Sequence, residues 1–462
     1  MQINKDKTSQ KIVNFTKNIS FEDLPIETIK QAKNLIIDTL ACIMAGSSAA
    51  GVKEVKEIFD NLGGNQQANI IGFDQKNSVV NSAFINSVMC HARDFDDTHD
   101  GSIHHGCVTL LPFLFALTQY LKINNKKISG KDFLLSLIIG LEVSNKIGLS
   151  FIKYLHTGWL PTTLWGPFGC IAAGAKIMNF SDEKILNGLG LAYSQINGNR
   201  QVLIDGVLAK RIQPAFATQA SFNALFMAEK NIVGAQRVFE GDYSIANLFT
   251  NGKMDLENIN ELGKSYETEK ISIKPYPSCR CTHPVIDAAL SLKINPQFKL
   301  NKLSKLEIYL PPKSFGQIGQ KFKIRENPQV DAQFSAQYTT ALILIEGKIS
   351  IVDFENINIF MRKDIEKLAK KITVIEHFKN EPSLTPIKMV AYLKGGETIE
   401  KQINQPKGNC LNPLSNEDLE NKFFDCAKYS IKKYKTEELS SIIRMVKNIE
   451  KMKDMTVLID LL

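Results

Sequence analysis

The stretch His91-Ala-Arg-Asp-Phe-Asp-Asp-Thr-His-Asp-Gly-Ser-Ile-His-His105 holds four of the seven histidines of the chain and four aspartates. Apolar runs flank it at residues 79–90 and 107–121, so we expect it to lie against a core. Ionisable side chains near a core are costly unless they are paired or used, and such a cluster predicts a catalytic or binding site. The alternative is a capped helix end, in which Asp and Thr side chains satisfy free backbone groups.

Length and composition predict a large protein without membrane contact. The 462 residues suggest two or three domains at about 150 residues each, and 44% hydrophobic residues suffice for a sizeable core. No apolar run reaches the roughly 18 residues of a membrane span, and residues 1–11 lack the apolar centre of a signal peptide. Eight scattered cysteines without a CxxC motif are typical of reduced thiols, which favours the cytoplasm.

The charge balance excludes an obvious nucleic-acid site. The formal net charge is +8, and much of the excess lies in the last segment of the chain. Acidic residues are interleaved with these lysines, which indicates a solvated helix face and no nucleic-acid partner. A mildly basic balance suits a small anionic substrate.

Most of the chain carries apolar residues at helical spacing. Residues 12–46 read as helical with a break near Asp23, where Asp-Leu-Pro supplies a new start signal. Further helices are predicted at residues 79–90, 107–121, 133–147, 182–195 and 215–229. Small residues are frequent between Gly166 and Met178, which predicts closely packed helices there.

The pattern changes near residue 265. Residues 305–310 alternate polar and apolar as a half-buried strand does, and residues 387–393 and 398–403 read as a hairpin around a Gly pair. We therefore predict a mainly α fold with an α+β part. A large helical domain would comprise residues 1–265 and 405–462, and a smaller α/β lid would comprise residues 266–404. A cleft between the two would be the place for a ligand.

Three other stretches could carry chemistry. In Asp205-Gly-Val-Leu-Ala-Lys-Arg211 two cations follow a Gly turn, and the alternative is a solvated turn. In Lys274-Pro-Tyr-Pro-Ser-Cys-Arg-Cys-Thr-His283 two prolines fix a loop that displays Lys274, Arg280 and His283, which suits carboxylate recognition. In the third stretch, residues 331–338, Tyr338 could donate a proton. The alternative is a core position, because a Tyr in a helix is more often half-buried core.

A metal site is the competing interpretation of the first stretch. His91, Asp94, His99, His104 and His105 offer ligands for a divalent ion. The chain has no HExxH motif and no second His/Asp block, so we predict neither a metal nor another cofactor.

Five motifs together resemble the MmgE/PrpD family and span nearly the whole chain. They are Asp94-Phe-Asp-Asp-Thr98 followed by His104, Ala209-Lys-Arg, Ile273-Lys-Pro-Tyr-Pro-Ser-Cys-Arg with Thr282-His-Pro, Gln333-Phe-Ser-x-x-Tyr338 and Asn412-Pro-Leu-Ser. The family includes 2-methylcitrate dehydratase, cis-aconitate decarboxylase and iminodisuccinate epimerase. The resemblance implies a cofactor-free homodimer with a large helical domain and a smaller α/β lid.

The resemblance also assigns roles to individual residues. It implies catalytic roles for Asp94, Thr98, His104, Lys210 and Lys274, and a place beside them for Tyr338. We expect His91, Arg280 and Leu160 to contact substrate as well. His104 would move a proton near neutral pH, and the lysines would stabilise charge beside a carboxylate.

Three positions depart from the family pattern. His105 stands where a proline usually follows the first histidine, and Leu160 and Gln213 stand where the family usually has histidines. A Leu cannot move a proton, so the fold carries over better than any particular reaction. Two hypotheses remain: a lyase or isomerase acting on a small di- or tricarboxylate, and an altered family member that binds a carboxylate or a partner without turnover.

Overall fold

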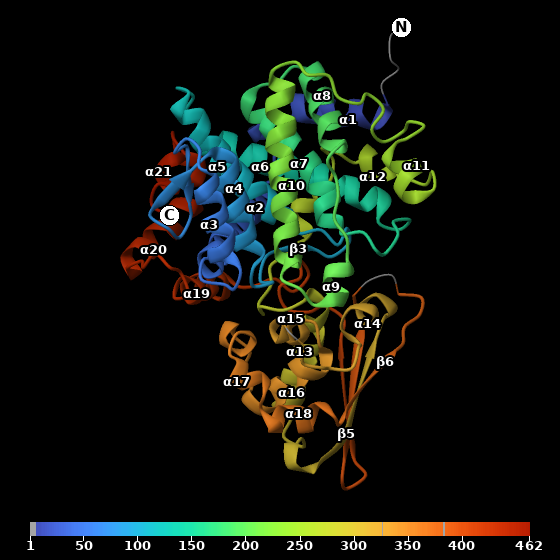
Figure 1. Ribbon diagram of the computed structural model, residues 1–462. Coiled ribbons are helices and arrows are strands. Elements are labelled where there is room, and N and C mark those ends of the chain that lie inside the picture. Colours follow the sequence, from blue (N-terminus) through green and yellow to red (C-terminus); the bar gives the residue numbers. More distant parts are fainter. Residues whose placement is uncertain (1–5, 326, 382–383) are drawn as a thin grey trace.

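The helices of the larger lobe form where the sequence spaces its apolar residues helically. The computed structural model describes residues 6–325, 327–381 and 384–462, and it shows a large helical lobe above a smaller α/β lobe, the lid (Figure 1). This confirms the predicted fold class. The main helices of the large lobe are α1 (Lys7–Asn18), α2 (Ile26–Gly46), α3 (Val52–Leu62), α4 (Val79–His91), α5 (Gly106–Ile123), α6 (Gly130–Phe151), α7 (Pro161–Met178), α8 (Asp182–Tyr193) and α10 (Ala209–Glu229).

Short elements connect these helices. They are η1 (Phe21–Asp23), α9 (Gln201–Asp205), α11 (Ile245–Thr250), α12 (Leu256–Asn260), η2 (Glu267–Lys270) and the two-stranded pairs β1 (Ala68–Ile70) with β2 (Gln75–Asn77) and β3 (Thr98–His99) with β4 (Ile271–Ser272). The break between α1 and α2 lies where the sequence predicts it. Ser129 caps the start of α6, since its hydroxyl accepts a hydrogen bond from the backbone N of Asp132.

The small residues of α7 allow it to pack closely on α6. A Cβ on Gly169 would lie 2.5 Å from the carbonyl oxygen of Gly140, so neither position tolerates a side chain. This confirms the close packing predicted for that run. Contrary to the expectation from the sequence, helices α5 and α6 are long and apolar enough to span a membrane by length and composition alone. In their most apolar 18-residue windows, 83% and 94% of the residues are buried inside the lobe, as in core helices.

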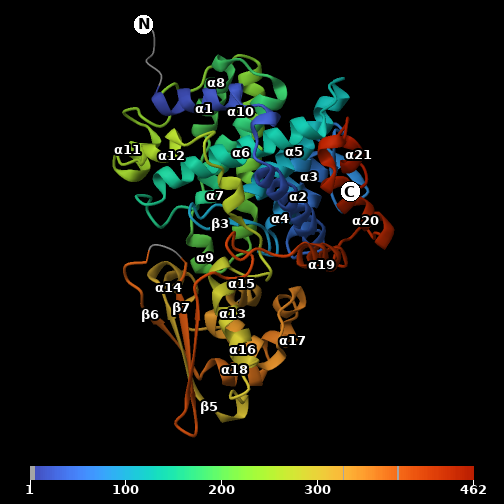
Figure 2. The same cartoon turned by 180° about the vertical axis from the view of Figure 1, so that it is seen from behind.

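The lid is built on a four-stranded sheet in the order β6-β5-β7-β8. Its strands are β5 (Leu303–Leu310), β6 (Ile372–Glu376), β7 (Ile387–Leu393) and β8 (Thr398–Ile403). Its helices lie on one face of the sheet (Figures 1 and 2), and they are η3 (Arg280–Thr282), α13 (His283–Lys293), η4 (Leu300–Lys302), α14 (Pro312–Ile318), α15 (Pro328–Gln333), α16 (Ala336–Glu346), η5 (Ile351–Phe354), α17 (Ile357–Phe360) and α18 (Lys363–Ala369).

The predicted hairpin and strand of the lid are confirmed. β7 and β8 pair antiparallel from Ile387 opposite Ile403 to Tyr392 opposite Thr398, and Gly396 in the turn has φ +87°. β5 pairs antiparallel with β7 and parallel with β6. β6 was not predicted from the sequence, and only its first residue, Ile372, is buried.

The end of the chain returns to the helical lobe. Helices α19 (Asn416–Ala427), α20 (Thr436–Lys447) and α21 (Thr456–Ile459) lie beside α2 and α3 in both views (Figures 1 and 2). Leu419, Phe423 and Ile442 belong to the larger core. That core still includes Ile273, whereas the lid core begins at Cys279, 13 residues after the predicted start of the lid at residue 266.

Candidate active site

A short strand pair brings two distant stretches of the chain together. In β3 and β4, Thr98 pairs with Ser272 and His99 with Ile271. The pair lies at the end of the helical lobe that faces the lid (Figure 1). The loop of residues 94–105 therefore lies beside the loop that begins at Lys274.

Two lysines share the carboxylate of Asp94. Lys274 Nζ donates to Asp94 Oδ1 at 2.6 Å and to the Asp94 carbonyl at 2.9 Å, and Lys210 Nζ lies 3.1 Å from Oδ2. Asp94 has φ 53°, a left-handed conformation that Asp tolerates. Lys210 lies in the first turn of α10, which starts six residues earlier than predicted. The structure thus brings together three residues that the sequence predicts as catalytic.

The charges of this group depend on one another. Burial raises the pKa of Asp94, but the positive charges of Lys210 and Lys274 outweigh it and hold this pKa well below its usual range. Burial lowers the pKa of Lys274, and the negative charges of Asp94 and Asp96 more than offset it, so this pKa is raised. Asp94 and Lys274 are therefore charged at neutral pH, and two lysines face one carboxylate.

Two histidines flank a second buried carboxylate. His91 Nδ1 and His105 Nδ1 lie 2.9 Å and 3.0 Å from Asp96 Oδ2. Thr98 Oγ1 lies 3.4 Å from His105 Nδ1. The charge of Asp96 acts on Lys274 and that of Lys210 on His91, so this pair adjoins the Asp94 group. Burial lowers the pKa of His91 to about 4, which leaves its ring neutral at pH 7.

His104 has no hydrogen bond to either group among the described residues. It is 0% exposed, and neither ring nitrogen has a hydrogen-bond partner among the described residues. The backbones of His104 and His99 bond to each other, and Ile103 between them has φ 53°. This turn separates the two neighbouring rings: that of His105 reaches Asp96, and that of His104 lies above Gly106. Sequence reasoning favoured His104 over His105 as the proton carrier, although both followed the aspartates.

His104 should make stability depend on pH. Burial lowers its pKa from 6.5 to about 3, so the unfolded chain takes up the proton first as pH falls. The contribution of the neutral ring to the free energy of unfolding is fully present above pH 6.5, and it is lost as pH falls toward 3. Between pH 7 and pH 5 we expect the His104→Gln variant to lose about 2 kcal/mol less unfolding free energy than the wild type. Urea unfolding at both pH values measures this, and equal losses would contradict a buried neutral ring.

Lys422 of α19 holds both site loops in place. Its Nζ donates to the carbonyls of Phe95 at 2.8 Å and Lys274 at 2.9 Å, and pairs with Asp38 Oδ1 at 2.5 Å. No motif in the sequence distinguishes Lys422 from the many other lysines of the chain. The returning C-terminal segment therefore positions the Asp94 group.

Helix α7 begins against the His105 loop. The backbone N of His105 donates to Thr162 Oγ1 at 3.1 Å, in the first turn of α7. Leu160, the residue before that helix, is half-buried, and its carbonyl accepts from Thr163. Gln213 binds both backbone groups of Asn199, so it fixes a loop at a position where the family usually has a histidine.

The structure does not bring Arg280 and Tyr338 to the Asp94 group as free side chains. Arg280 binds both oxygens of Asp100, with its Nε 3.0 Å from Oδ1 and its Nη2 3.0 Å from Oδ2, and it also donates to the Lys407 carbonyl. Tyr338 is fully buried in the lid core and donates to the Asp353 carbonyl at 2.8 Å. Both side chains already have partners within the protein, and sequence alone does not reveal such partners.

His91, Asp96 and His105 offer ligand atoms within 4.8 Å of one another, which is close enough to hold a metal ion. Two imidazoles and a carboxylate are a donor set that suits several divalent metals. Lys210 and Lys274, however, place positive charge beside it. The surroundings therefore fit an anionic ligand better than a cation.

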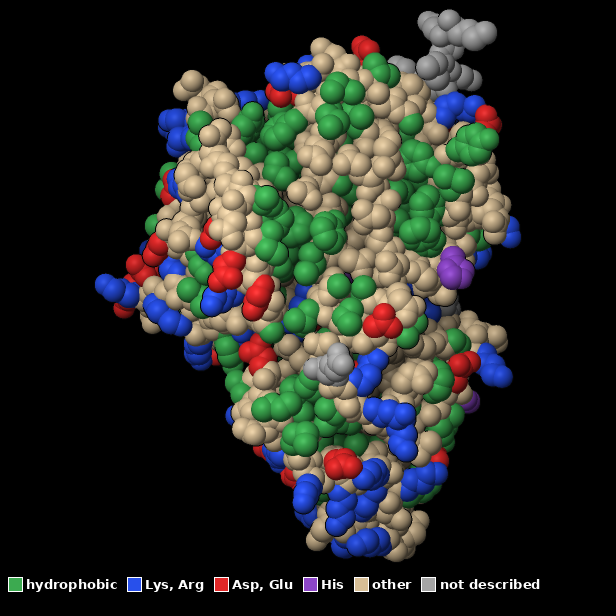
Figure 3. Space-filling model, viewed as in Figure 1, with side chains coloured by type: hydrophobic (Ala, Val, Ile, Leu, Met, Phe, Trp, Pro, Cys, Tyr) green, Lys and Arg blue, Asp and Glu red, His purple; other side chains and the backbone are tan. Residues whose placement is uncertain are grey.

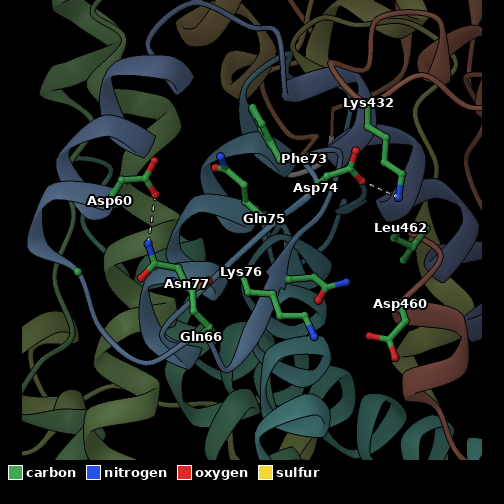
Figure 4. Close-up of a pocket in the computed structure, with 12 residues that line it drawn as sticks. Asp60, Gln66, Phe73, Asp74, Gln75, Lys76, Asn77, Lys432, Asp460 and Leu462 are labelled. Atoms are coloured by element: carbon green, nitrogen blue, oxygen red, sulfur yellow. Dashed lines mark hydrogen bonds and ion pairs between the residues drawn. The ribbon is translucent and has the colours of Figure 1, made fainter.

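A groove of about 640 Å³ lies elsewhere, at the edge of the helical lobe between β2 and the end of the chain (Figure 4). Its two lysines face aspartates: Lys432 Nζ lies 3.4 Å from Asp74, and Asp60 and Asp460 line the same groove as Lys76. It carries no excess of positive charge comparable to the Asp94 group, so we place the active site at the junction of the lobes.

Comparisons with known proteins show the family of the chain. Residues 10–257 match the MmgE/PrpD N-terminal domain and residues 276–448 match the MmgE/PrpD C-terminal domain. The chain is 25% identical to a cis-aconitate decarboxylase-like protein, oryM, of Aspergillus oryzae, over 98% of this chain and 96% of that protein. It is 24% identical to the cis-aconitate decarboxylase of Aspergillus terreus (99% and 96% covered) and 26% identical to that of Homo sapiens (94% and 90% covered). The chain belongs to the MmgE/PrpD family.

Proposed function

We propose that this protein is a lyase that breaks a bond at a carbon beside a carboxylate of a small di- or tricarboxylate. One observation carries the proposal: Lys210 and Lys274 share the single carboxylate of Asp94 in a buried setting. Two cations on one anion leave positive charge that a substrate carboxylate can neutralise. The names of the relatives, which are cis-aconitate decarboxylases, support the same class of reaction.

The arrangement suits a carbanion-like transition state. In a decarboxylation the bond to the leaving carboxylate breaks, CO₂ departs, and its electron pair stays on carbon beside a second carboxylate. Lys210 and Lys274 stabilise that charge as it grows. His105 then delivers a proton to the carbon, held in position by Asp96. In a dehydration the histidine takes the proton from carbon, the C–H electron pair forms the C=C bond, and the histidine returns the proton to the departing hydroxyl, which leaves as water. In an epimerisation the histidine takes the proton from carbon, and a proton returns to the opposite face of the same carbon.

Leu160 favours the second candidate, which is carboxylate binding without turnover. An apolar side chain beside the start of α7 cannot move a proton or bind a hydroxyl, and burying a polar group against it costs about 1–3 kcal/mol. If catalysis is retained, we expect a substrate with fewer polar groups than 2-methylcitrate. Slow or absent dehydration of 2-methylcitrate would follow.

Proton NMR in heavy water tests the proposal. The purified protein is incubated with cis-aconitate, 2-methylcitrate and smaller unsaturated and α-hydroxy dicarboxylates. A product one carboxylate shorter that carries deuterium would show decarboxylation, deuterium in recovered substrate would show epimerisation, and a new alkene would show dehydration. Binding in calorimetry without any of these changes would support the second candidate. Absence of both binding and turnover would contradict the two candidates together, and activity that disappears with a chelator would contradict the proposal that no metal takes part.

The proposal includes a homodimer in a reducing compartment such as the cytoplasm. Exposed apolar side chains gather on the face of the helical lobe around α10 (Figure 3), among them Phe216 and Met227 of α10 and Ile58 and Leu62 of α3. A second copy of the chain would cover such a face. All eight cysteines are free thiols, seven of them buried. Sedimentation equilibrium gives the mass in solution, and a monomer would contradict the dimer.

A further inference from the structure

Arg211 differs from the other buried arginines at the junction of the lobes. Arg280 has the carboxylate of Asp100, and Arg93 Nη1 lies 2.9 Å from Glu355. Arg211 is only 4% exposed, and its Nη1 and Nη2 have no hydrogen-bond partner among the described residues. The guanidinium therefore presents two unused donor groups in a buried place.

Such an arrangement is costly unless an anion completes it. A buried guanidinium without a counter-ion loses its hydration without replacement, a cost of several kcal/mol. Glu355 is already paired with Arg93, and Asp94 is shared by Lys210 and Lys274. Burial lowers the pKa of Arg211 to about 10, and the nearby charges of Asp94 and Glu355 counteract this, so the side chain stays charged at neutral pH.

Arg211 lies beside the proposed reaction site. It follows Lys210 directly in the first turn of α10, and its charge interacts with that of Asp94. The planar fork of a guanidinium matches a carboxylate with two parallel N–H···O bonds, which an ammonium cannot do. Lys210 with Lys274 and, in the same turn of α10 as Lys210, Arg211 thus offer two different kinds of site for negative charge.

We propose that Arg211 binds a second substrate carboxylate, remote from the bond that breaks, and so selects di- and tricarboxylates over monocarboxylates. This inference rests on the proposed function of the Asp94 group. Arg211 thereby adds a selectivity for a second carboxylate that Lys210 and Lys274 do not provide. Sequence reasoning recognised Arg211 only as the second of two adjacent cations.

Isothermal titration calorimetry with tricarballylate, a saturated tricarboxylate, and with butyrate, a monocarboxylate, tests this. The Arg211→Met variant should bind tricarballylate roughly 10- to 100-fold more weakly than the wild type and butyrate equally well. The Lys210→Met variant should weaken both. Arg211→Lys keeps the charge without the fork, and its affinity for tricarballylate should lie between those of the wild type and the Met variant.

The outcomes separate this inference from the function on which it rests. If the wild type binds tricarballylate and both Arg211 variants bind it as tightly, the inference is overturned while the carboxylate site stands. If the wild type binds no carboxylate, the proposed function and the inference both fail. A Glu355→Gln variant serves as the control for lobe closure. If it reproduces the loss of selectivity seen with Arg211→Met, Arg211 acts through the lid and not on the substrate.

Discussion

The Lys274→Met variant is expected to lose about 10³-fold in kcat/KM with the acid identified by the heavy-water screen. Lys274 is 0% exposed, and its Nζ makes two contacts with Asp94. A cation in this setting stabilises negative charge that grows between the bound substrate and the transition state, so kcat should fall more than KM rises.

Stability should change much less than activity. Asp94 keeps Lys210 as a counter-ion at 3.1 Å, so removal of Lys274 leaves no isolated charge. We expect the unfolding free energy to fall by about 1–3 kcal/mol, because the Asp94 carbonyl loses its donor.

Lys293→Met is the matched control for this variant. Lys293 is half-buried. Its Nζ donates to the carbonyls of Leu344 and Ile345 in the lid, away from the Asp94 group. Its replacement should lower stability by a similar amount and leave kcat/KM within about threefold of the wild type, since no site charge changes. Equal losses of activity in both variants would show that Lys274 acts only through stability.

Local patterns predict the fold well because they act over short distances. The break near Asp23, the turn at Gly396 and the close packing at Gly169 each follow from residues within one or two turns. β6 pairs parallel with β5 and joins residues 66 positions apart, from Leu306 opposite Ile372 to Leu310 opposite Glu376. Its β-branched run, residues 372–375, is a local strand signal, but the long-range partner that makes it a strand of this sheet is not visible in the sequence.

The candidate site was predictable in its residue types and less so in its partners. Asp94, Lys210 and Lys274 meet as the motifs imply. Arg280 is paired with Asp100, 180 positions earlier in the chain, and only the tertiary structure brings the two together. That Arg211 lacks such a partner among the described residues is likewise visible only in the tertiary structure.

The choice between His104 and His105 is the case where sequence alone could not decide. The two residues are adjacent and chemically identical, and the resemblance to the family favours the first. The left-handed residue Ile103 and the backbone bonds between His99 and His104 decide which ring reaches Asp96. A left-handed Ile is an uncommon conformation that no sequence rule anticipates.

The second large effect is therefore expected at His105 and not at His104. His105→Gln should lower kcat by about 10²–10⁴-fold, the usual contribution of a positioned acid or base. The His105 side chain is 17% exposed and contacts Asp96. The backbone N of His105 is held by its hydrogen bond to Thr162 Oγ1. His104→Gln should retain most of kcat, because the wild-type ring is buried with no partner and reaches neither Asp96 nor the lysines. Steady-state kinetics of the two variants measures this, with a variant of the exposed His377, His377→Gln, as the control.

A large loss of kcat in His104→Gln with none in His105→Gln would assign the proton transfer to His104. Wild-type kcat in both variants would leave His91 as the remaining proton carrier on Asp96.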